Sequence, residues 1–334
     1  MKHILIVDDD KTNLTLAKQE LSKYYQVTPV TSGFQALQFL EKKSTDLILL
    51  DISMPEMDGR ETMKRIREHK EWAKIPIIFL TADSKPETES QCLSDGANDF
   101  ISKPFVPQVM QSRVSRILEL TELRNDLEER LMEKTKEVEL VTLNAIMAIA
   151  HTIEAKDLYT SGHSNRVAKC SVAIAKRLGW DDEAIKNLNY SALLHDIGKI
   201  AVPDVILNKP MALTDEEFDV LKKHPVIGGD ILKGITTIPD VQLGALYHHE
   251  RYDGTGYPSG KKGEEIPIEA RIIAIADTYD AMTSNRAYRQ ALPYNIVISE
   301  LENGRGTQFD PVLVELFLQM LKEDESLIVR EDTV

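Results

Sequence analysis

The chain has 334 residues, 42% of them hydrophobic and 28% charged, which is enough for about two globular domains. Its formal net charge of -14 argues against a DNA-binding protein, because phosphate neutralisation requires a basic face. The first apolar run, "ILIV", is too short for a signal peptide, and we expect no later stretch to approach a membrane span. The expected location is the cytoplasm.

Five short apolar runs alternate with helix-patterned segments in the first third of the chain. They are "ILIV" at 4–7, "VTPV" at 27–30, "LILL" at 47–50, "IIFL" at 77–80 and "DFIS" at 99–102. Strands alternating with helices predict an α/β domain with a doubly wound, five-stranded parallel sheet covered on both faces. In such sheets, ligands bind beyond the carboxyl ends of the strands.

Polar side chains follow four of these runs. Asp8 and Asp9 come after the first run, Asp51 after the third, Thr81 after the fourth and Lys103 after the fifth. Three clustered carboxylates repel one another unless a hard cation such as Mg²⁺ lies among them, and a nearby lysine can pair with an anion. The set predicts a site where a carboxylate accepts a phosphoryl group.

The motifs "VDDD", "LLDISMPEMDG", "LTA" and "SKPF" resemble the receiver domain of two-component response regulators, which has a flavodoxin-like fold. The resemblance implies that Asp51 accepts a phosphoryl group from a sensor histidine kinase, and that Thr81 and Lys103 bind its oxygens. The implied Mg²⁺ ligands are Asp8, Asp9, Asp51 and Ser53, the last through its main-chain carbonyl. Phe100 stands at the family's switching aromatic, and we expect a cis bond before Pro104.

A glycine-free segment rich in Glu, Lys, Arg and Leu follows, between about residues 109 and 145. Residues at intervals of three and four, all but one of them apolar, form a seam like the a and d positions of a coiled coil. They are Leu120, Leu123, Leu127, Leu131, Lys134, Val138, Val141 and Ala145. This length of charged helix favours a connector that pairs with a second copy in a homodimer. The alternative is one amphipathic helix packed on its own domain.

The rest of the chain predicts helices alone. The segments are "NAIMAIAHTIEA", "HSNRVAKCSVAIAKRLG", "EAIKNLNYSALLHDIG", "TDEEFDVLKKH", "ARIIAIADTYDAM" and "PVLVELFLQML". Thr214 and Glu217 form the pattern of a capping box, in a helix that should stop at Pro225. We therefore expect a receiver at 1–118, a helical connector at 119–145 and an all-α domain at 146–334.

Five of the eight histidines lie in this helical part where apolar spacing points inward, together with two carboxylates. They are His163, His195, His224, His248 and His249, with Asp196 and Asp277. One such histidine is usually a hydrogen-bonded core residue, but buried ions in this number call for a metal centre. Asp196 can bridge two metals roughly 3.5 to 4 Å apart, and a nitrogen and oxygen ligand set favours Fe, Mn or a similar ion.

"HDIGK" at 195–199 and "HHERYDGTGYP" at 248–258 resemble the signatures of the HD-GYP phosphodiesterases, which hydrolyse cyclic di-GMP to linear pGpG and more slowly to GMP. The resemblance implies two metal sites, one of His163, His195, Asp196 and Asp277 and one of Asp196, His224, His248 and His249. Lys199, Arg286 and Arg289 are implied to bind phosphate, with Asp196 and Lys199 at the reaction centre. Asp280 is implied to orient substrate or to support a ligand.

One departure from the family concerns the number of metals. Some members write "ETGxH" before the first histidine and use the glutamate for a third metal, whereas this chain reads "YTSGH" with Tyr159 there. We therefore expect a binuclear centre, although Glu154 and Asp157 lie upstream and can in principle substitute.

The glycine-rich loop, residues 250–260, has two interpretations. Gly254, Gly256 and Gly260 suit a tight turn that closes the domain. Alternatively, the loop lines the mouth of the metal site, and Tyr257 offers an exposed ring to substrate or partner. In the family, this loop is also linked to diguanylate cyclase (GGDEF) domains.

Two rival functions stay open. The chain can be a catalytically silent cyclic-dinucleotide sensor that acts through protein contacts, but its complete ligand set favours an enzyme. It can also hydrolyse a different cyclic dinucleotide. His3, His69 and His151 receive no role, and Cys92 and Cys170 lack CxxC spacing and are expected to be small core residues.

Overall fold

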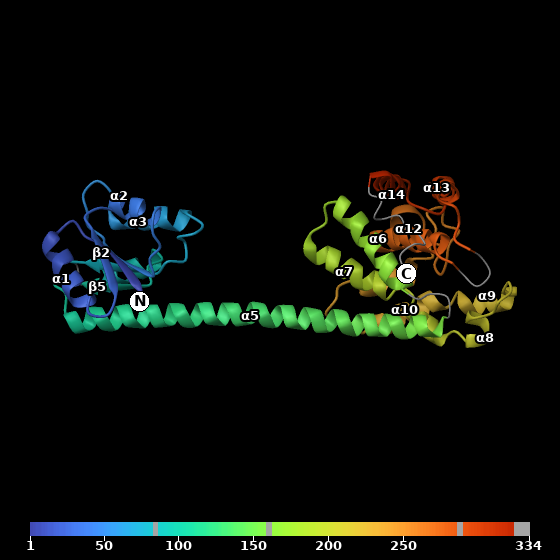
Figure 1. Cartoon of the computed structure of the whole chain (residues 1–334), viewed down its shortest axis with the longest axis horizontal. Helices are drawn as coiled ribbons and strands as arrows, with labels where there is room; N and C mark the ends of the chain where they lie inside the picture. The colour runs from blue at the N-terminus through green and yellow to red at the C-terminus, as the bar shows by residue number, and fades with distance from the viewer. Residues whose placement is uncertain (83–85, 158–161, 286–289, 324–334) are drawn as a thin grey trace. The chain divides into compact units, whose positions relative to one another are not determined.

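The computed structural model describes the chain except residues 83–85, 158–161, 286–289 and 324–334 (Figure 1). Two compact units make it up, Met1–Thr135 and Lys136–Val334. The division falls inside one long helix, so each unit holds one part of that helix.

Unit 1 contains a sheet of five parallel strands. The strands are β1 (His3–Val7), β2 (Gln26–Val30), β3 (Leu47–Asp51), β4 (Ile77–Thr81) and β5 (Asp99–Ser102), in the order β2-β1-β3-β4-β5. All five predicted strands are confirmed. The register pairs Asp51 with Leu80 and Thr81 with Ser102, so the carboxyl ends of β3, β4 and β5 lie at one edge.

Alternating side chains of the strands fill the two faces of this sheet. Ile4 and Ile6 join the cluster formed with α1 (Lys11–Leu21) and the start of α5 (Pro107–Lys156). Leu5 and Val7 join the cluster on the opposite face, formed with α2 (Gly33–Leu40) and α3 (Gly59–Glu68). A further helix, α4 (Pro86–Ser94), precedes β5. Both faces of the sheet are therefore covered, as the sequence predicted.

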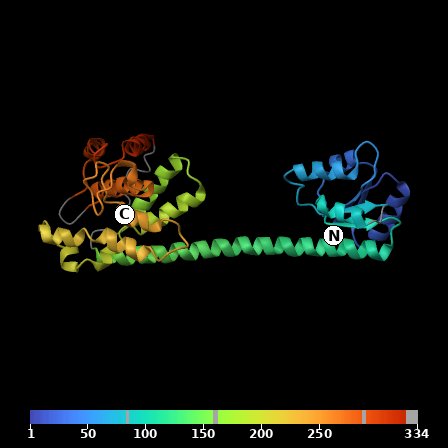
Figure 2. The same cartoon turned by 180° about the vertical axis from the view of Figure 1, so that it is seen from behind.

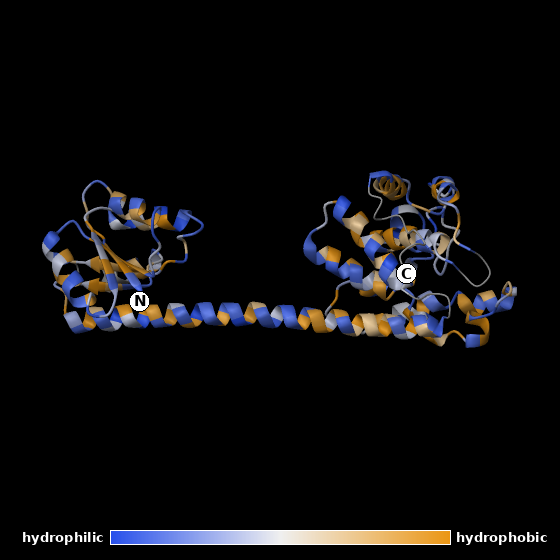
Figure 3. Ribbon diagram, in the orientation of Figure 1, coloured by the Kyte–Doolittle hydropathy of each residue, from blue (hydrophilic) through white to orange (hydrophobic). Residues whose placement is uncertain are grey.

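Helix α5 is continuous over 50 residues. The helix predicted at "NAIMAIAHTIEA" is confirmed, and because no glycine or proline interrupts the segment from Gln108 to Lys156, these residues form the last turns of α5. In Figure 3, polar and apolar residues alternate along its length.

One 18-residue window of α5 reaches a mean hydropathy of 1.3, so by length and composition it passes the test for a membrane span. The expectation that no later stretch approaches a membrane span is therefore wrong for the length and hydropathy of this window. Core helices pass the same test, and Ile146 and Ile153 of α5 belong to the hydrophobic core of unit 2.

The described residues of unit 2 form helices joined by short connections, with no strand. Besides the end of α5, they are α6 (His163–Arg177), α7 (Asp182–Leu193), η1 (Ile197–Ala201), α8 (Asp204–Leu207), α9 (Asp215–Leu221), α10 (His224–Leu232), α11 (Val241–Tyr247), η2 (Gly263–Glu265), α12 (Ile268–Thr283), α13 (Tyr294–Asn303) and α14 (Pro311–Glu323). The all-α prediction is confirmed for these residues.

Two helix boundaries differ from the sequence prediction. The capping box of Thr214 and Glu217 is present, but α9 ends at Leu221, and His224 opens α10 instead of closing α9. The segment "HDIG" does not continue α7, because a short 3-10 helix, η1, begins at Ile197. Both histidine-bearing segments therefore lie at helix ends.

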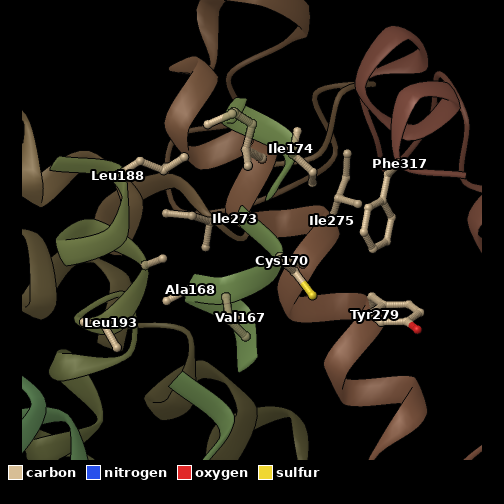
Figure 4. Close-up of a cluster of buried hydrophobic side chains, with 14 of the residues drawn as sticks. Val167, Ala168, Cys170, Ile174, Leu188, Leu193, Ile273, Ile275, Tyr279 and Phe317 are labelled. Atoms are coloured by element: carbon tan, nitrogen blue, oxygen red, sulfur yellow. The ribbon is translucent and has the colours of Figure 1, made fainter. Parts of the chain in front are cut away.

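The core of unit 2 forms where α6, α7, α12 and α14 meet (Figure 4). Val167, Cys170 and Ile174 of α6 are spaced by three and four residues and lie on one buried face. Tyr279 of α12 packs edge-on against Phe317 of α14, with ring centroids 5.1 Å apart. His163 begins the same buried face of α6, so the core fixes its position.

Candidate functional site

The predicted phosphoacceptor site assembles at the carboxyl edge of the sheet in unit 1. Lys103 Nζ lies 2.6 Å from Asp51 Oδ2 and 2.8 Å from Asp8 Oδ2. Asp8 and Asp51 are buried and Asp9 is exposed, and the three residues offer carboxylate oxygens within 4.8 Å of one another. Burial raises the pKa of Asp51, and its hydrogen bond with Lys103 opposes that rise.

The other predicted residues of unit 1 surround this cluster. Thr81 is buried at the end of β4, and the main-chain N–H of Ser53 donates to Asp51 Oδ1 at 3.4 Å. Phe100 is partly buried, and the guanidinium of Arg113 lies 4.9 Å from the centre of its ring. The Lys103–Pro104 bond is cis, as expected.

In unit 2, Asp196 lies between two groups of histidines. Its Oδ2 is 3.4 Å from His195 Nε2 and 3.8 Å from His163 Nε2. Its Oδ1 is 3.4 Å from His224 Nε2 and 3.8 Å from His248 Nε2. The two oxygens of one carboxylate thus face two separate sets of donors.

The remaining two predicted ligands complete these sets. Asp277 Oδ1 lies 3.3 Å from His163 Nε2. The ring of His249 lies 4.1 Å from that of His248 and 5.0 Å from that of His224. Three overlapping groups keep their potential ligand atoms within 4.8 Å: His163, His195 and Asp277; His224, His248 and His249; and His195, Asp196 and His248.

Hydrogen bonds at Nδ1 orient the histidine rings. Nδ1 of His195 lies 2.7 Å from the carbonyl of Ala192, and Nδ1 of His224 lies 2.8 Å from the carbonyl of Leu221. His248 makes the same kind of bond, at 2.9 Å to the carbonyl of Gly244. Because a carbonyl can only accept, each Nδ1 carries a proton, and in the neutral form of the ring Nε2 presents a lone pair toward Asp196.

This arrangement fits divalent metal ions. His195 Nε2 is buried and has no hydrogen-bond partner, and it faces another acceptor, Asp196 Oδ2, at 3.4 Å. His224 Nε2 and His248 Nε2 are likewise 3.5 Å apart. Lone pairs directed at one another inside a protein are unfavourable, and a cation between them removes the conflict.

Burial lowers the pKa of three of the histidines, His224, His248 and His249, and so favours their neutral form. Burial lowers the pKa of His248 well below its ordinary value, and the neighbouring His249 lowers it further. Burial, with His224 beside it, lowers the pKa of His249 to about 4. Neutral imidazole is the form that binds a metal.

His163 behaves differently. Burial lowers its pKa, but the hydrogen bonds with Asp277 and Asp280 outweigh burial and raise it to about 9. A proton on Nε2 would compete with a cation for the space between His163 and Asp277, so a metal held there would displace that proton.

Lys199 and Asp280, both singled out by sequence, contact the ligands themselves. Lys199 Nζ lies 2.7 Å from Asp196 Oδ2 and 3.5 Å from Asp157 Oδ2. Asp280 Oδ2 is 2.7 Å from His163 Nδ1. Arg166, which the sequence reading missed, donates from Nε to Asp280 Oδ1 at 2.5 Å; its position one turn after His163 on α6 was the available signal. The geometry places Asp280 as support for His163.

Four residues that the sequence analysis considered are not placed in this cluster. Arg286, Arg289 and Tyr159 fall outside the described residues. Glu154, considered above as a substitute ligand, instead accepts hydrogen bonds from the main-chain N–H groups of Gly162 and Ser164.

The glycine-rich loop folds back onto the second histidine group. The N–H of Tyr257 donates to the carbonyl of His249 at 3.2 Å, and the two rings stack 4.9 Å apart. A Cβ on Gly256 would lie 2.6 Å from that same carbonyl, so only glycine fits. Tyr257 is partly buried in this packing, and the alternative that it offers its ring to substrate or partner stays a prediction.

Comparison with known proteins matches both units. A model of the response regulator receiver domain matches residues 4–115, and a model of the HD domain matches residues 147–313. The cyclic di-GMP phosphodiesterase response regulator RpfG of Xanthomonas campestris is 37% identical over 95% of this chain and 87% of that protein. A cyclic di-GMP phosphodiesterase of Thermotoga maritima is 35% identical over 99% of this chain and 93% of that one.

A shorter match covers half of this chain. The 3'3'-cGAMP-specific phosphodiesterase 3 of Vibrio cholerae is 39% identical over 50% of this chain and 36% of that protein. The full-length similarity, the two domain matches and the clustered histidines and aspartates all indicate the same family. The chain belongs to the cyclic di-GMP phosphodiesterase response regulators, in which a receiver domain precedes an HD domain.

Proposed function

We propose that this response regulator hydrolyses cyclic di-GMP to linear pGpG, and more slowly to GMP, under the control of phosphorylation at Asp51. The observation that carries the proposal is the position of Asp196 between two sets of imidazole nitrogens. The proposed organisation is a receiver at 1–118, a connector at 119–145 and the phosphodiesterase domain at 146–334. A sensor histidine kinase supplies the phosphoryl group, and the proposed location is the cytoplasm.

The proposed output centre is binuclear and holds Fe or Mn, while Mg²⁺ occupies the receiver site of Asp8, Asp9, Asp51 and Ser53. His163, His195, Asp196 and Asp277 hold one output metal, and Asp196, His224, His248 and His249 hold the other. The use of Glu154 as a helix cap supports two metals over three. When bound, such metals activate water and neutralise charge on phosphate oxygens.

The protein's own groups bind and orient the substrate around that centre. Burial lowers the pKa of Lys199, but the carboxylates of Asp196 and Asp157 outweigh burial and raise it, so its ammonium stays charged. This charge can move from Asp196 to a phosphate oxygen as charge develops there. We assign Arg286 and Arg289 to phosphate binding, Asp280 to the support of His163, and Tyr257 to the wall of the substrate site beside His249.

The proposed active form is a homodimer through α5. Six seam residues are each at least half exposed in the single chain: Leu120, Leu123, Leu127, Leu131, Val138 and Val141. A second copy would cover this apolar seam. The exposed tip of the glycine-rich loop, Pro258–Gly260, is the proposed contact for a diguanylate cyclase (GGDEF) domain.

Product analysis with two substrates tests the activity. Mn²⁺-loaded full-length chain should convert cyclic di-GMP to pGpG faster than it converts 3'3'-cGAMP, as resolved by chromatography. Asp196→Asn should remove turnover and reduce bound metal from about two ions per chain, while the receiver still accepts a phosphoryl group. Binding of cyclic di-GMP without hydrolysis, at full metal loading, would instead identify a silent sensor.

A further inference from the structure

The last turn of α5 is bound to the segment that carries Asp196. Lys156, the final residue of α5, donates from Nζ to three main-chain carbonyls: those of Lys199 at 3.3 Å, Ile200 at 2.7 Å and Val202 at 2.5 Å. These carbonyls close the 3-10 helix η1, which begins directly after Asp196. In both views, α8 and α10 lie beside this end of α5 (Figures 1 and 2).

The contact uses the full hydrogen-bonding capacity of the lysine. An ammonium has three donors, and here each meets one carbonyl at the C-terminal end of η1, where a positive charge is also favourable. The side chain is 22% exposed. The carbonyl of Lys156 itself accepts a hydrogen bond from Asn208 at 2.9 Å. The helix end is therefore fixed through both its side chain and its main chain.

The same turn of α5 also holds the segment that carries His163. Glu154 is buried, and its two oxygens accept from Gly162 N at 2.9 Å and Ser164 N at 2.7 Å, the residues on either side of His163. The N-cap of α6 is Gly162, which has no side chain with which to cap the helix. The preceding helix thus supplies this cap.

We propose that Glu154 and Lys156 are positioning residues of the metal centre, through which a displacement of α5 changes the spacing between His163 and Asp196. Glu154 holds the segment that carries His163, and Lys156 holds the segment that carries Asp196 and Lys199. In the structure, His163 Nε2 and Asp196 Oδ2 are 3.8 Å apart. The regulatory part of this inference rests on the proposed function, because it assigns α5 as the route from the receiver to the phosphodiesterase site.

Lysine-to-methionine substitution at two positions of α5 tests the inference in the full-length chain. Lys156→Met should weaken Mn²⁺ binding to the metal-free protein by about tenfold or more, measured by titration calorimetry. It should also bring the ratio of turnover with and without beryllofluoride, an acyl-phosphate mimic, toward one. Lys136→Met removes an exposed lysine from the same helix and should leave both quantities unchanged. Lys156→Arg keeps a cationic donor and should restore most of the affinity.

A second variant separates positioning from folding. Glu154→Gln keeps the size of the side chain but sets an amide NH₂ against one of the two N–H groups, so Mn²⁺ affinity should fall while the melting temperature stays near that of the parent. Parental affinity and parental regulation in both variants would overturn the proposal, as would unfolding of the domain in both. Absence of hydrolysis in the parent would reject the proposed function alone, since the Mn²⁺ affinities still test positioning.

Discussion

The Nδ1 hydrogen bonds of His195, His224 and His248 each reach a carbonyl three or four residues earlier in the chain. All three histidines follow or open helices, so their rings lie beside carbonyls of the last turn of the preceding helix. The Gly244 carbonyl also accepts from the main-chain N–H of His248, at 3.1 Å. The orientation of these three rings therefore comes from the local backbone. No residue distant in the sequence is needed to orient them.

All seven residues that the sequence predicts as metal ligands lie together in the structure, because their residue types and inward spacing have few other uses. Their role as ligands stays a prediction. The sequence did not predict the supporting contacts. Arg166 meets Asp280 across 114 residues, and Lys156 meets Lys199 across 43. Arginine and lysine on a helix usually face solvent, so only the packing of segments distant in sequence reveals these roles.

Gly198 lies where η1 packs against α10, two residues after Asp196. A Cβ there would lie 1.9 Å from the carbonyl oxygen of His224 and 2.6 Å from the nitrogen of Gly228, both main-chain atoms. This close approach brings η1 onto α10, and with it Asp196 toward His224.

We expect Gly198→Ala to lower the unfolding free energy of the helical unit by about 1–3 kcal/mol and to reduce its metal content. Urea denaturation and metal analysis measure the two effects. Gly234→Ala is the matched control, because a Cβ at Gly234 has no neighbour within 4 Å. Equal stability of the two variants would show that η1 and α10 are not constrained by this contact.

At the scale of elements, the sequence predicted the strands of unit 1 and most helices of unit 2, since their periodicity and caps are local signals. The boundaries at His224 and around α5 were wrong for physical reasons. Pro225 can start a helix as well as stop one, and a glycine-free, proline-free segment gives α5 no place to end. Nor does the sequence show where the glycine-rich loop folds, because the stacking of Tyr257 on His249 is a tertiary contact.

The seam of α5 gives a prediction at this scale. Leu127→Lys should convert a dimer to a monomer in sedimentation analysis, because a charge enters the centre of the apolar seam. Leu140→Lys makes the same substitution at a residue that is 59% exposed and, at 100° per residue, lies on the side of the helix away from the seam. It should remain dimeric. A parent that sediments as a monomer would contradict the proposed dimer.

At the scale of the whole molecule, two sites with different chemistry share one chain. The receiver site has carboxylates and one lysine, and the output site has imidazoles around the carboxylate of Asp196. Helix α5 begins in the receiver and ends with Lys156 on the segment that follows Asp196. In the proposed regulation by phosphorylation at Asp51, α5 is the helix that joins the two units.

The rate of pGpG formation by the metal-loaded, full-length chain, measured with and without beryllofluoride, tests this account most directly. We predict measurable hydrolysis of cyclic di-GMP, at a rate that differs between the two conditions in the parent and is the same in both for Asp51→Asn. Absence of hydrolysis in both conditions, from a sample shown to contain about two metal ions per chain, would contradict the account.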